Sequence, residues 1–194
     1  MVRAPEPAQT PTHFTLSGRD VGQPDGVPAG MASVRSLTAG YDPADDVDLD
    51  GFAGSLTTYA VALALAVLLG RATNQRLPSR YDPADLAIGA LATHKAARLV
   101  SKSSVMSPVR APFTEFGEPA GAAEHHEEAR GDHGMRHVVG ELITCPFCLS
   151  VWMGSAYVAG LVFVPRPTRT LAAVLTVVSG SDVAQHLYQR LRGD

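Results

Sequence analysis

The stretch Tyr59-Ala-Val-Ala-Leu-Ala-Leu-Ala-Val-Leu-Leu69 decides the expected fold, because it is almost wholly apolar and built from the good helix formers Ala and Leu. It lies within the run Gly51–Gly70, which carries no charged side chain. A helix of about 20 residues rises roughly 30 Å, which is the thickness of the hydrocarbon core of a bilayer. A buried helix of a soluble protein is the alternative, but the chain offers little other apolar surface to surround such a helix. We therefore predict that residues 51–70 span a membrane.

Three further segments extend this prediction along the chain. Residues 142–165 are uncharged and form the second clear span, with small residues that would let a neighbouring helix approach closely. Residues 170–189 contain one charge, Asp182, and follow a short Arg166–Arg169 turn, as in a helical hairpin. Residues 84–101 carry Lys95 and Arg98, so this segment either spans, with these side chains snorkelling toward the surface, or lies as an amphipathic helix at the interface. Asp85 is the expected N-cap of this helix.

The expected fold class is therefore all-α: a helical integral membrane protein with three to four transmembrane helices. Residues 51–194 would form the transmembrane domain, and residues 102–141 a polar loop within it. Residues 1–50 are rich in Pro, Gly and Asp, and this composition predicts a disordered N-terminal arm. Its acidic end, residues 42–50, is expected to be a solvated linker or, alternatively, a docking tail for a basic partner.

Charge and cysteine content exclude two classes of protein. The net charge is −3, so no overall basic surface favours nucleic-acid binding. The chain has 2 cysteines, too few for a disulfide-rich secreted domain. The lipid bilayer is the expected partner, with a protein partner possible and no nucleic acid.

Two blocks of sequence resemble a known family. In the first, Arg98-Leu-Val is followed by Ser107-Pro-Val-Arg-Ala-Pro-Phe113; in the second, Gly140-Glu-Leu leads into Cys145-Pro-Phe-Cys148 and then Trp152. Together they are similar to domain of unknown function 1360, a family of small bacterial membrane proteins, some of them sporulation-associated. The resemblance covers residues 84–190 and implies a helical membrane protein, with no activity attached to it.

The pair Cys145 and Cys148 is the first candidate site. Thr144 is the expected N-cap and Pro146 suits the first helical position, so Cys148 would lie in the first helical turn. The positive end of the helix dipole there favours the thiolate. The pair could be redox-active, bind a metal, or consist of structural thiols packed at a helix entrance; no strand–helix–strand pattern of the thioredoxin type surrounds it.

The second candidate is a histidine cluster. His133, His137 and Glu141 follow one another at intervals of four residues, which places them on one face of a continuous helix. With the cysteine pair they could bind zinc. Gly131 and Gly134 would loosen such a helix, so a polar His-rich loop without a cofactor is the competing interpretation.

The third candidate is basic. Arg98, Lys102 and Arg110 could bind lipid phosphates beside the membrane, or act only as signals for topology. Counting basic residues on the two sides favours a cytoplasmic location for the 102–141 loop of a multi-pass cell-membrane protein.

No catalytic triad, phosphate loop or paired carboxylates stand out, so we do not expect an enzyme. The expected function is that of a non-catalytic envelope or sporulation-associated component acting through partner contacts. The alternative is a membrane thiol–disulfide or metal-binding protein that uses Cys145 and Cys148.

Overall fold

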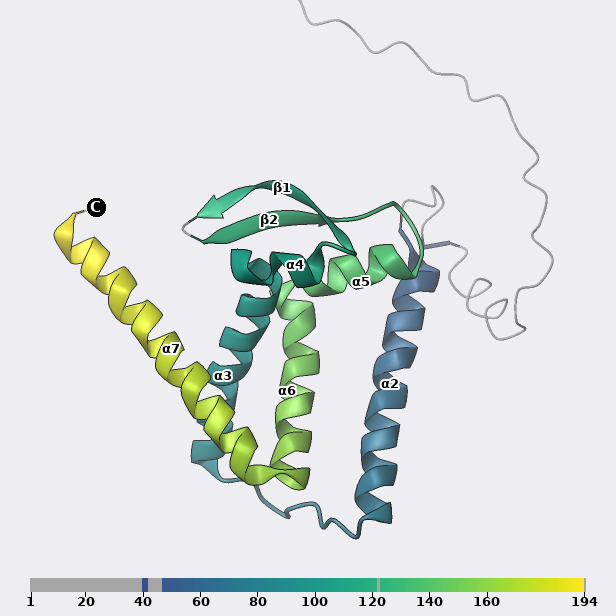
Figure 1. The fold of residues 1–194 in the computed structure, drawn as a ribbon. Coiled ribbons are helices and arrows are strands. Elements are labelled where there is room, and N and C mark those ends of the chain that lie inside the picture. Colours follow the sequence, from purple (N-terminus) through teal and green to yellow (C-terminus); the bar gives the residue numbers. More distant parts are fainter. Residues whose placement is uncertain (1–39, 42–46, 122, 194) are drawn as a thin grey trace, which may run out of the picture. The chain divides into compact units, whose positions relative to one another are not determined.

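The computed structural model describes residues 40–41, 47–121 and 123–193 (Figure 1). The predicted N-terminal arm, residues 1–50, lies mostly outside these residues. Its predicted end is too late by two residues, because Leu49 and Asp50 already belong to the first long helix.

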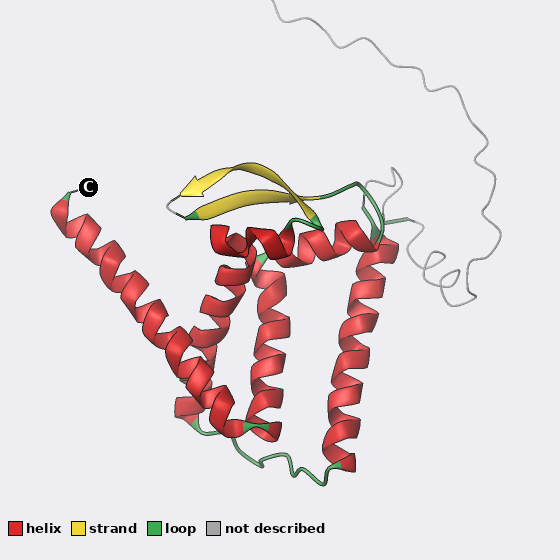
Figure 2. Ribbon diagram, viewed as in Figure 1, coloured by secondary structure: helices red, strands yellow, loops and turns green. Residues whose placement is uncertain are grey.

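Four long helices make up most of the described chain (Figure 2). They are α2 (Leu49–Ala72), α3 (Pro83–Lys102), α6 (Pro146–Phe163) and α7 (Pro165–Arg192). α3 packs against both α6 and α7, whereas α2 approaches α6 along a smaller contact. The chain passes down α2, up α3, down α6 and up α7 (Figure 1).

The short elements gather across one end of these helices, which we call the capped end. It comprises the 3-10 turn η1 (Ser104–Met106), α4 (Ser107–Arg110), the strands β1 (Thr114–Gly121) and β2 (Glu124–Ala129), and α5 (Met135–Thr144). The two strands form an antiparallel hairpin that lies over α5 (Figure 1). At the opposite end, which we call the loop end, residues 73–82 connect α2 to α3 and Val164 alone separates α6 from α7.

Two of the helices are long and apolar enough to cross a membrane by length and composition. α2 has a mean hydropathy of 2.0 over its most apolar window, and none of that window is buried within the described protein. α6 reaches a mean hydropathy of 1.5 with 6% of the window buried. α3 and α7 do not meet this criterion, so two of the three to four predicted spans have this support.

The prediction of an entirely helical fold was wrong in one region. Residues 102–141 are not a loop but contain η1, α4, the hairpin and α5. The strands are hard to recognise because β1 is rich in Glu, Gly and Pro and β2 in Glu and His, with few of the β-branched and aromatic residues that favour strands. The fold is mostly helical with one small two-stranded sheet.

The helix boundaries also correct the expected caps. Asp82, not Asp85, caps α3, with its carboxylate accepting a hydrogen bond from the Ala84 amide at 2.7 Å. Cys145, not Thr144, caps α6. The predicted span 142–165 therefore divides at Cys145, with its first residues in α5. The predicted turn Arg166–Arg169 belongs to the first turns of α7.

Small residues allow the helices to pack closely. A Cβ added at Gly89 of α3 would lie 2.1 Å from the ring of Tyr157 on α6, so only glycine fits there. Ala92, Ala97 and Ala172 are buried at the junction of α3 with its neighbours. Small side chains at such contacts let helix backbones approach one another.

Two ion pairs join α3 to α7. Asp85 pairs with Arg169 at 2.7 Å near the loop end, and Lys95 pairs with Asp182 farther along both helices. The second pair joins Lys95 and Asp182, charges that lie within the apolar segments 84–101 and 170–189.

Candidate functional site

A cavity of about 990 Å³ opens at the capped end, and the sequence candidates converge on it. It lies among α2, β2, α5 and the start of α6. Its lining includes five of the predicted site residues: Lys102, His137, Glu141, Cys145 and Cys148. Trp152 and Tyr59 form part of the wall. Residues from distant parts of the chain, from Phe52 to Trp152, thus meet at one cavity.

The cysteine pair occupies the corner between α5 and α6. Cys145 is the one residue between these helices, and its extended backbone, with φ −96° and ψ 107°, turns the chain. Its Sγ accepts a hydrogen bond from the Cys148 amide at 3.2 Å, and Pro146 occupies the first helical turn as predicted. Both thiols are free, and Cys148 is exposed. The geometry therefore makes Cys145 the N-cap of α6 and leaves Cys148 exposed.

The histidine cluster is only partly assembled. α5 begins at Met135, so His133 lies before the helix and does not share its face. His137 and Glu141 do share a face, with His137 Nε2 3.6 Å from Glu141 Oε1. In the described residues, no group of three or more His, Cys, Asp or Glu side chains is arranged to hold a metal ion. Zinc binding remains a prediction.

His137 and Glu141 each have a buried polar atom without a partner in the described part of the chain. His137 Nδ1 and Glu141 Oε2 are buried and have no hydrogen-bond partner among the described atoms. Buried polar atoms are usually paired, because leaving them unpaired costs free energy. Both side chains line the cavity, so a polar group that enters it could supply the missing bonds.

The three predicted basic residues have separate environments. Arg98 forms two hydrogen bonds with Glu124 of the hairpin, at 3.0 and 2.9 Å. Lys102 lines the cavity. Arg110 is fully buried, so its guanidinium is not available to a lipid headgroup.

The buried pair of Arg110 and Glu127 is a feature that the sequence did not reveal. Arg110 donates to both oxygens of Glu127, at 2.9 and 2.6 Å, and to the carbonyls of Val100 and Ser103. Ser107 and Thr114 also donate to the Glu127 carboxylate. Burial alone would raise the pKa of Glu127, but these bonds and the Arg110 charge lower it to about 2. The pair fixes the hairpin to α3 and α4.

An aromatic contact joins α2 to α6 beside the cavity. The rings of Tyr59 and Trp152 meet edge to face with centroids 5.1 Å apart. The Tyr59 hydroxyl is hydrogen-bonded to Ser155 Oγ at 2.7 Å. At the capped end, Asp48 bonds to the amides of Gly51 and Gly134, which ties α2 to the start of α5. These contacts hold the α2 wall of the cavity.

Comparison with known proteins finds a family that covers about half of the chain. The family model described as "Protein of unknown function (DUF1360)" matches residues 88–188, which is α3 to α7 together with the capped end. The sporulation protein YjcA of Bacillus subtilis (strain 168) is 26% identical over 103 residues, covering 52% of this chain and 86% of that protein. No solved structure matches the chain.

Proposed function

Because the chain belongs to the DUF1360 family, whose function is unknown, we propose a function from its structure: a non-catalytic, sporulation-associated component of the cell membrane that presents its capped end to a partner. The sporulation association rests on the similarity to sporulation protein YjcA. The membrane location rests on the exposure of α2.

The exposure of α2 is the observation that carries the proposal. Large apolar side chains point outward on all sides of this helix, among them Leu56 at 69%, Leu65 at 59% and Leu69 at 54% exposed. A contiguous apolar surface of this extent is rare on a soluble monomer and marks contact with lipid or protein. In a bilayer, α2 and α6 would span, and α3 and α7, joined through their ion pairs, would cross beside α6 as the third and fourth spans.

The capped end is the part suited to a protein partner. The hairpin is locked to the helices by Arg110 and Glu127, so it offers a fixed surface. The hairpin exposes Phe116, 62% exposed, on the face that also carries Glu127, and it exposes the acidic pair Glu115 and Glu128 on the other face. Exposed aromatic side chains are enriched at protein interfaces.

Carbonate extraction and thiol labelling test the membrane proposal and its orientation. The chain should remain in the carbonate-washed membrane pellet. A membrane-impermeant maleimide should fail to label Cys148 in intact cells and should label it after permeabilisation, since we place the capped end in the cytoplasm. As a control, Ser79→Cys at the loop end, in a chain with both native cysteines replaced by Ser, should be labelled from outside. Release by carbonate would overturn the membrane location, and labelling of Cys148 from outside would reverse the orientation.

A thiol–disulfide or metal-binding function is the second candidate. It is favoured by the accessible Cys148 thiol and by the unpaired His137 and Glu141 atoms at the same cavity. Replacing both cysteines by Ser distinguishes the two candidates. An unchanged ability to complement a deletion of the gene supports the non-catalytic role, whereas loss of complementation with normal protein levels supports the thiol role.

A further inference from the structure

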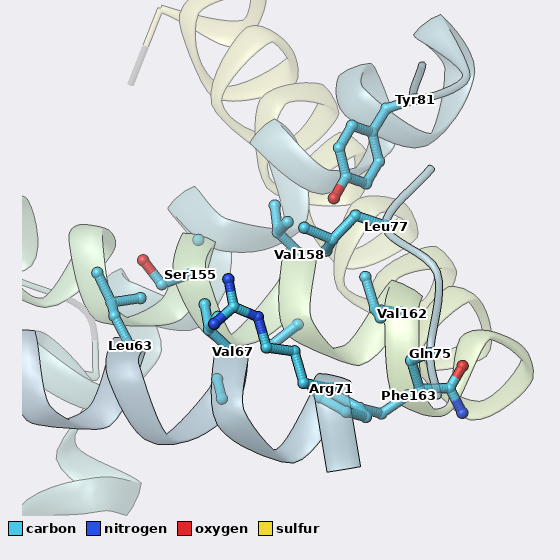
Figure 3. Close-up of a pocket in the computed structure, with 14 residues that line it drawn as sticks. Leu63, Val67, Arg71, Gln75, Leu77, Tyr81, Ser155, Val158, Val162 and Phe163 are labelled. Carbon is cyan, nitrogen blue, oxygen red and sulfur yellow. The ribbon is translucent and has the colours of Figure 1, made fainter. Parts of the chain in front are cut away.

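A second cavity, of about 680 Å³, lies between α2 and α6 toward the loop end (Figure 3). The two helices meet at Tyr59 and Ser155, and again where Gly70 faces the ring of Phe163. Between these contacts they leave a groove. We call it the α2–α6 groove.

The walls of the α2–α6 groove are apolar. Leu63, Ala66 and Val67 line it from α2, and α6 contributes a similar set. The residues from α6 are Gly154, Ser155, Val158, Ala159, Val162 and Phe163. A chain of methylene groups could occupy such a groove without leaving a polar atom unpaired.

The mouth of the groove is different in chemistry. Arg71 is the one charged residue among those that line it, and Gln75 and Tyr81 add an amide and a hydroxyl. Figure 3 shows the Arg71 side chain reaching back over the groove from the last turn of α2. Arg71, Gln75 and Tyr81 thus place hydrogen-bond donors along the loop end of the groove.

No described carboxylate neutralises Arg71. The two acidic side chains nearest along the chain have other roles, since Asp82 caps α3 and Asp85 pairs with Arg169. The connecting loop adds Arg76 and Arg80, both exposed. The mouth therefore carries positive charge with apolar walls behind it, which complements an anion attached to a hydrocarbon chain.

We propose that the α2–α6 groove binds one anionic phospholipid, with an acyl chain between the helices and its phosphate on Arg71. This inference rests on the proposed membrane location. Arg71 would pair with the phosphate, and Gln75 and Tyr81 would donate hydrogen bonds to it or to the adjoining ester. A helix from a second copy of the chain could fill the apolar walls, but it would leave Arg71 unexplained.

The single tryptophan of the chain provides the measurement. Trp152 contacts Tyr59, whose hydroxyl is bonded to Ser155 in the groove wall. The full-length protein is reconstituted into vesicles of phosphatidylcholine with increasing fractions of phosphatidylglycerol, and one of the two lipids carries brominated acyl chains. Bromine quenches tryptophan fluorescence at short range, so comparing the two labelling schemes gives the relative affinity at the groove.

We expect a preference of about fivefold for phosphatidylglycerol, the contribution of one basic residue beside anionic lipid. Arg71→Gln should abolish the preference. Ala66→Phe should abolish it by filling the groove. Two matched controls should keep it: Arg166→Gln, an arginine at the same end outside the groove, and Ala64→Phe, on another face of α2.

Three results would overturn the proposal. Equal quenching by the two lipids excludes an anionic site. A preference for phosphatidylglycerol that survives Ala66→Phe places the lipid site elsewhere. If Arg166→Gln loses the preference as fully as Arg71→Gln does, the preference reflects general surface charge. Carbonate extraction separates this test from the proposed function. A protein that stays in the membrane but shows no lipid preference rejects the lipid site alone. A protein that carbonate extracts rejects both the lipid site and the membrane location.

Discussion

The guanidinium of Arg110 and the carboxylate of Glu127, 17 residues apart in the chain, form a bidentate pair in which the two side chains are 0% and 4% exposed. A buried ion pair is weak evidence for net stability, but removing one partner leaves an uncompensated buried charge. The pair ties β2 to α4 and to the end of α3, beside the packing of β2 on α5.

Glu127→Gln should therefore destabilise the capped end by about 3–5 kcal/mol, because Arg110 stays buried without its counter-charge. The change is measured by chemical unfolding in detergent, with unfolding of the hairpin monitored as protease cleavage between residues 114 and 129. Glu124→Gln is the matched control; it breaks the more exposed pair with Arg98 and should cost at most about 1 kcal/mol. If the two substitutions lower the free energy of unfolding equally, the buried pair contributes no more than the exposed one.

The same carboxylate predicts how stability depends on pH. Its pKa falls from 4.5 to about 2 on folding, so the stabilisation is complete above pH 4.5 and is lost as the pH falls toward about 2. Hydrogen exchange of the hairpin amides should accelerate across this window. Subtracting the profile of Glu127→Gln isolates the contribution, and a difference that is flat from pH 5 to about 2 would contradict the assignment.

Lys95 and Asp182 test whether the α3–α7 contact lies in lipid. A double-mutant cycle with Lys95→Gln and Asp182→Asn should give a coupling energy above about 1 kcal/mol, the upper value for water-exposed pairs. The cycle for Arg98 and Glu124 at the capped end should stay below it. A weaker coupling for Lys95 and Asp182 than for the control pair would argue for an aqueous environment around α7.

Two helical glycines differ sharply in their surroundings. Gly89→Ala should destabilise the protein by about 1–3 kcal/mol through overpacking, because the Tyr157 ring lies in the way and its hydroxyl is held by the Asp85 carbonyl at 2.7 Å. Gly180→Ala meets nothing within 4 Å and should stabilise α7 by up to about 1 kcal/mol. Thermal unfolding in detergent distinguishes the two, and a neutral Gly89→Ala would show that α3 and α6 pack less closely.

Cys145 should tolerate serine better than alanine. Serine can keep the cap on the Cys148 amide, whereas alanine cannot and should cost about 1 kcal/mol of stability. Cys148→Ala, which retains the amide, is the control and should be near neutral. If Ser and Ala at position 145 are equally destabilising, the Sγ does not act as a cap.

The sequence predicted the parts of the fold that depend on local composition. Uncharged length located α2 and α6 to within a few residues, and Pro146 marked the start of α6. The hairpin was missed because its strands lack the usual β-forming residues, and its Arg110–Glu127 anchor joins residues that no local pattern connects. The partner of Asp182 was missed for the same reason, since Lys95 lies 87 residues away.

The candidate site also has parts that the sequence predicted and parts that it did not. The cysteine pair and the His137–Glu141 spacing were visible in the sequence, and both line one cavity. His133 was grouped with them on the assumption of a helix that in fact begins two residues later, at Met135. The α2–α6 groove had no sequence signal, because its walls are ordinary apolar residues of two separate helices.

The corner at Cys145 has a mechanical consequence. A single residue separates α5 from α6, and the hairpin packs on α5 while the Arg110–Glu127 pair ties it to α3 and α4. Helices respond to a thicker or thinner bilayer by changing their tilt. If α6 spans a bilayer as proposed, a change in its tilt has to be taken up at Cys145 or passed through α5 to the whole capped end, since no longer loop separates the two helices.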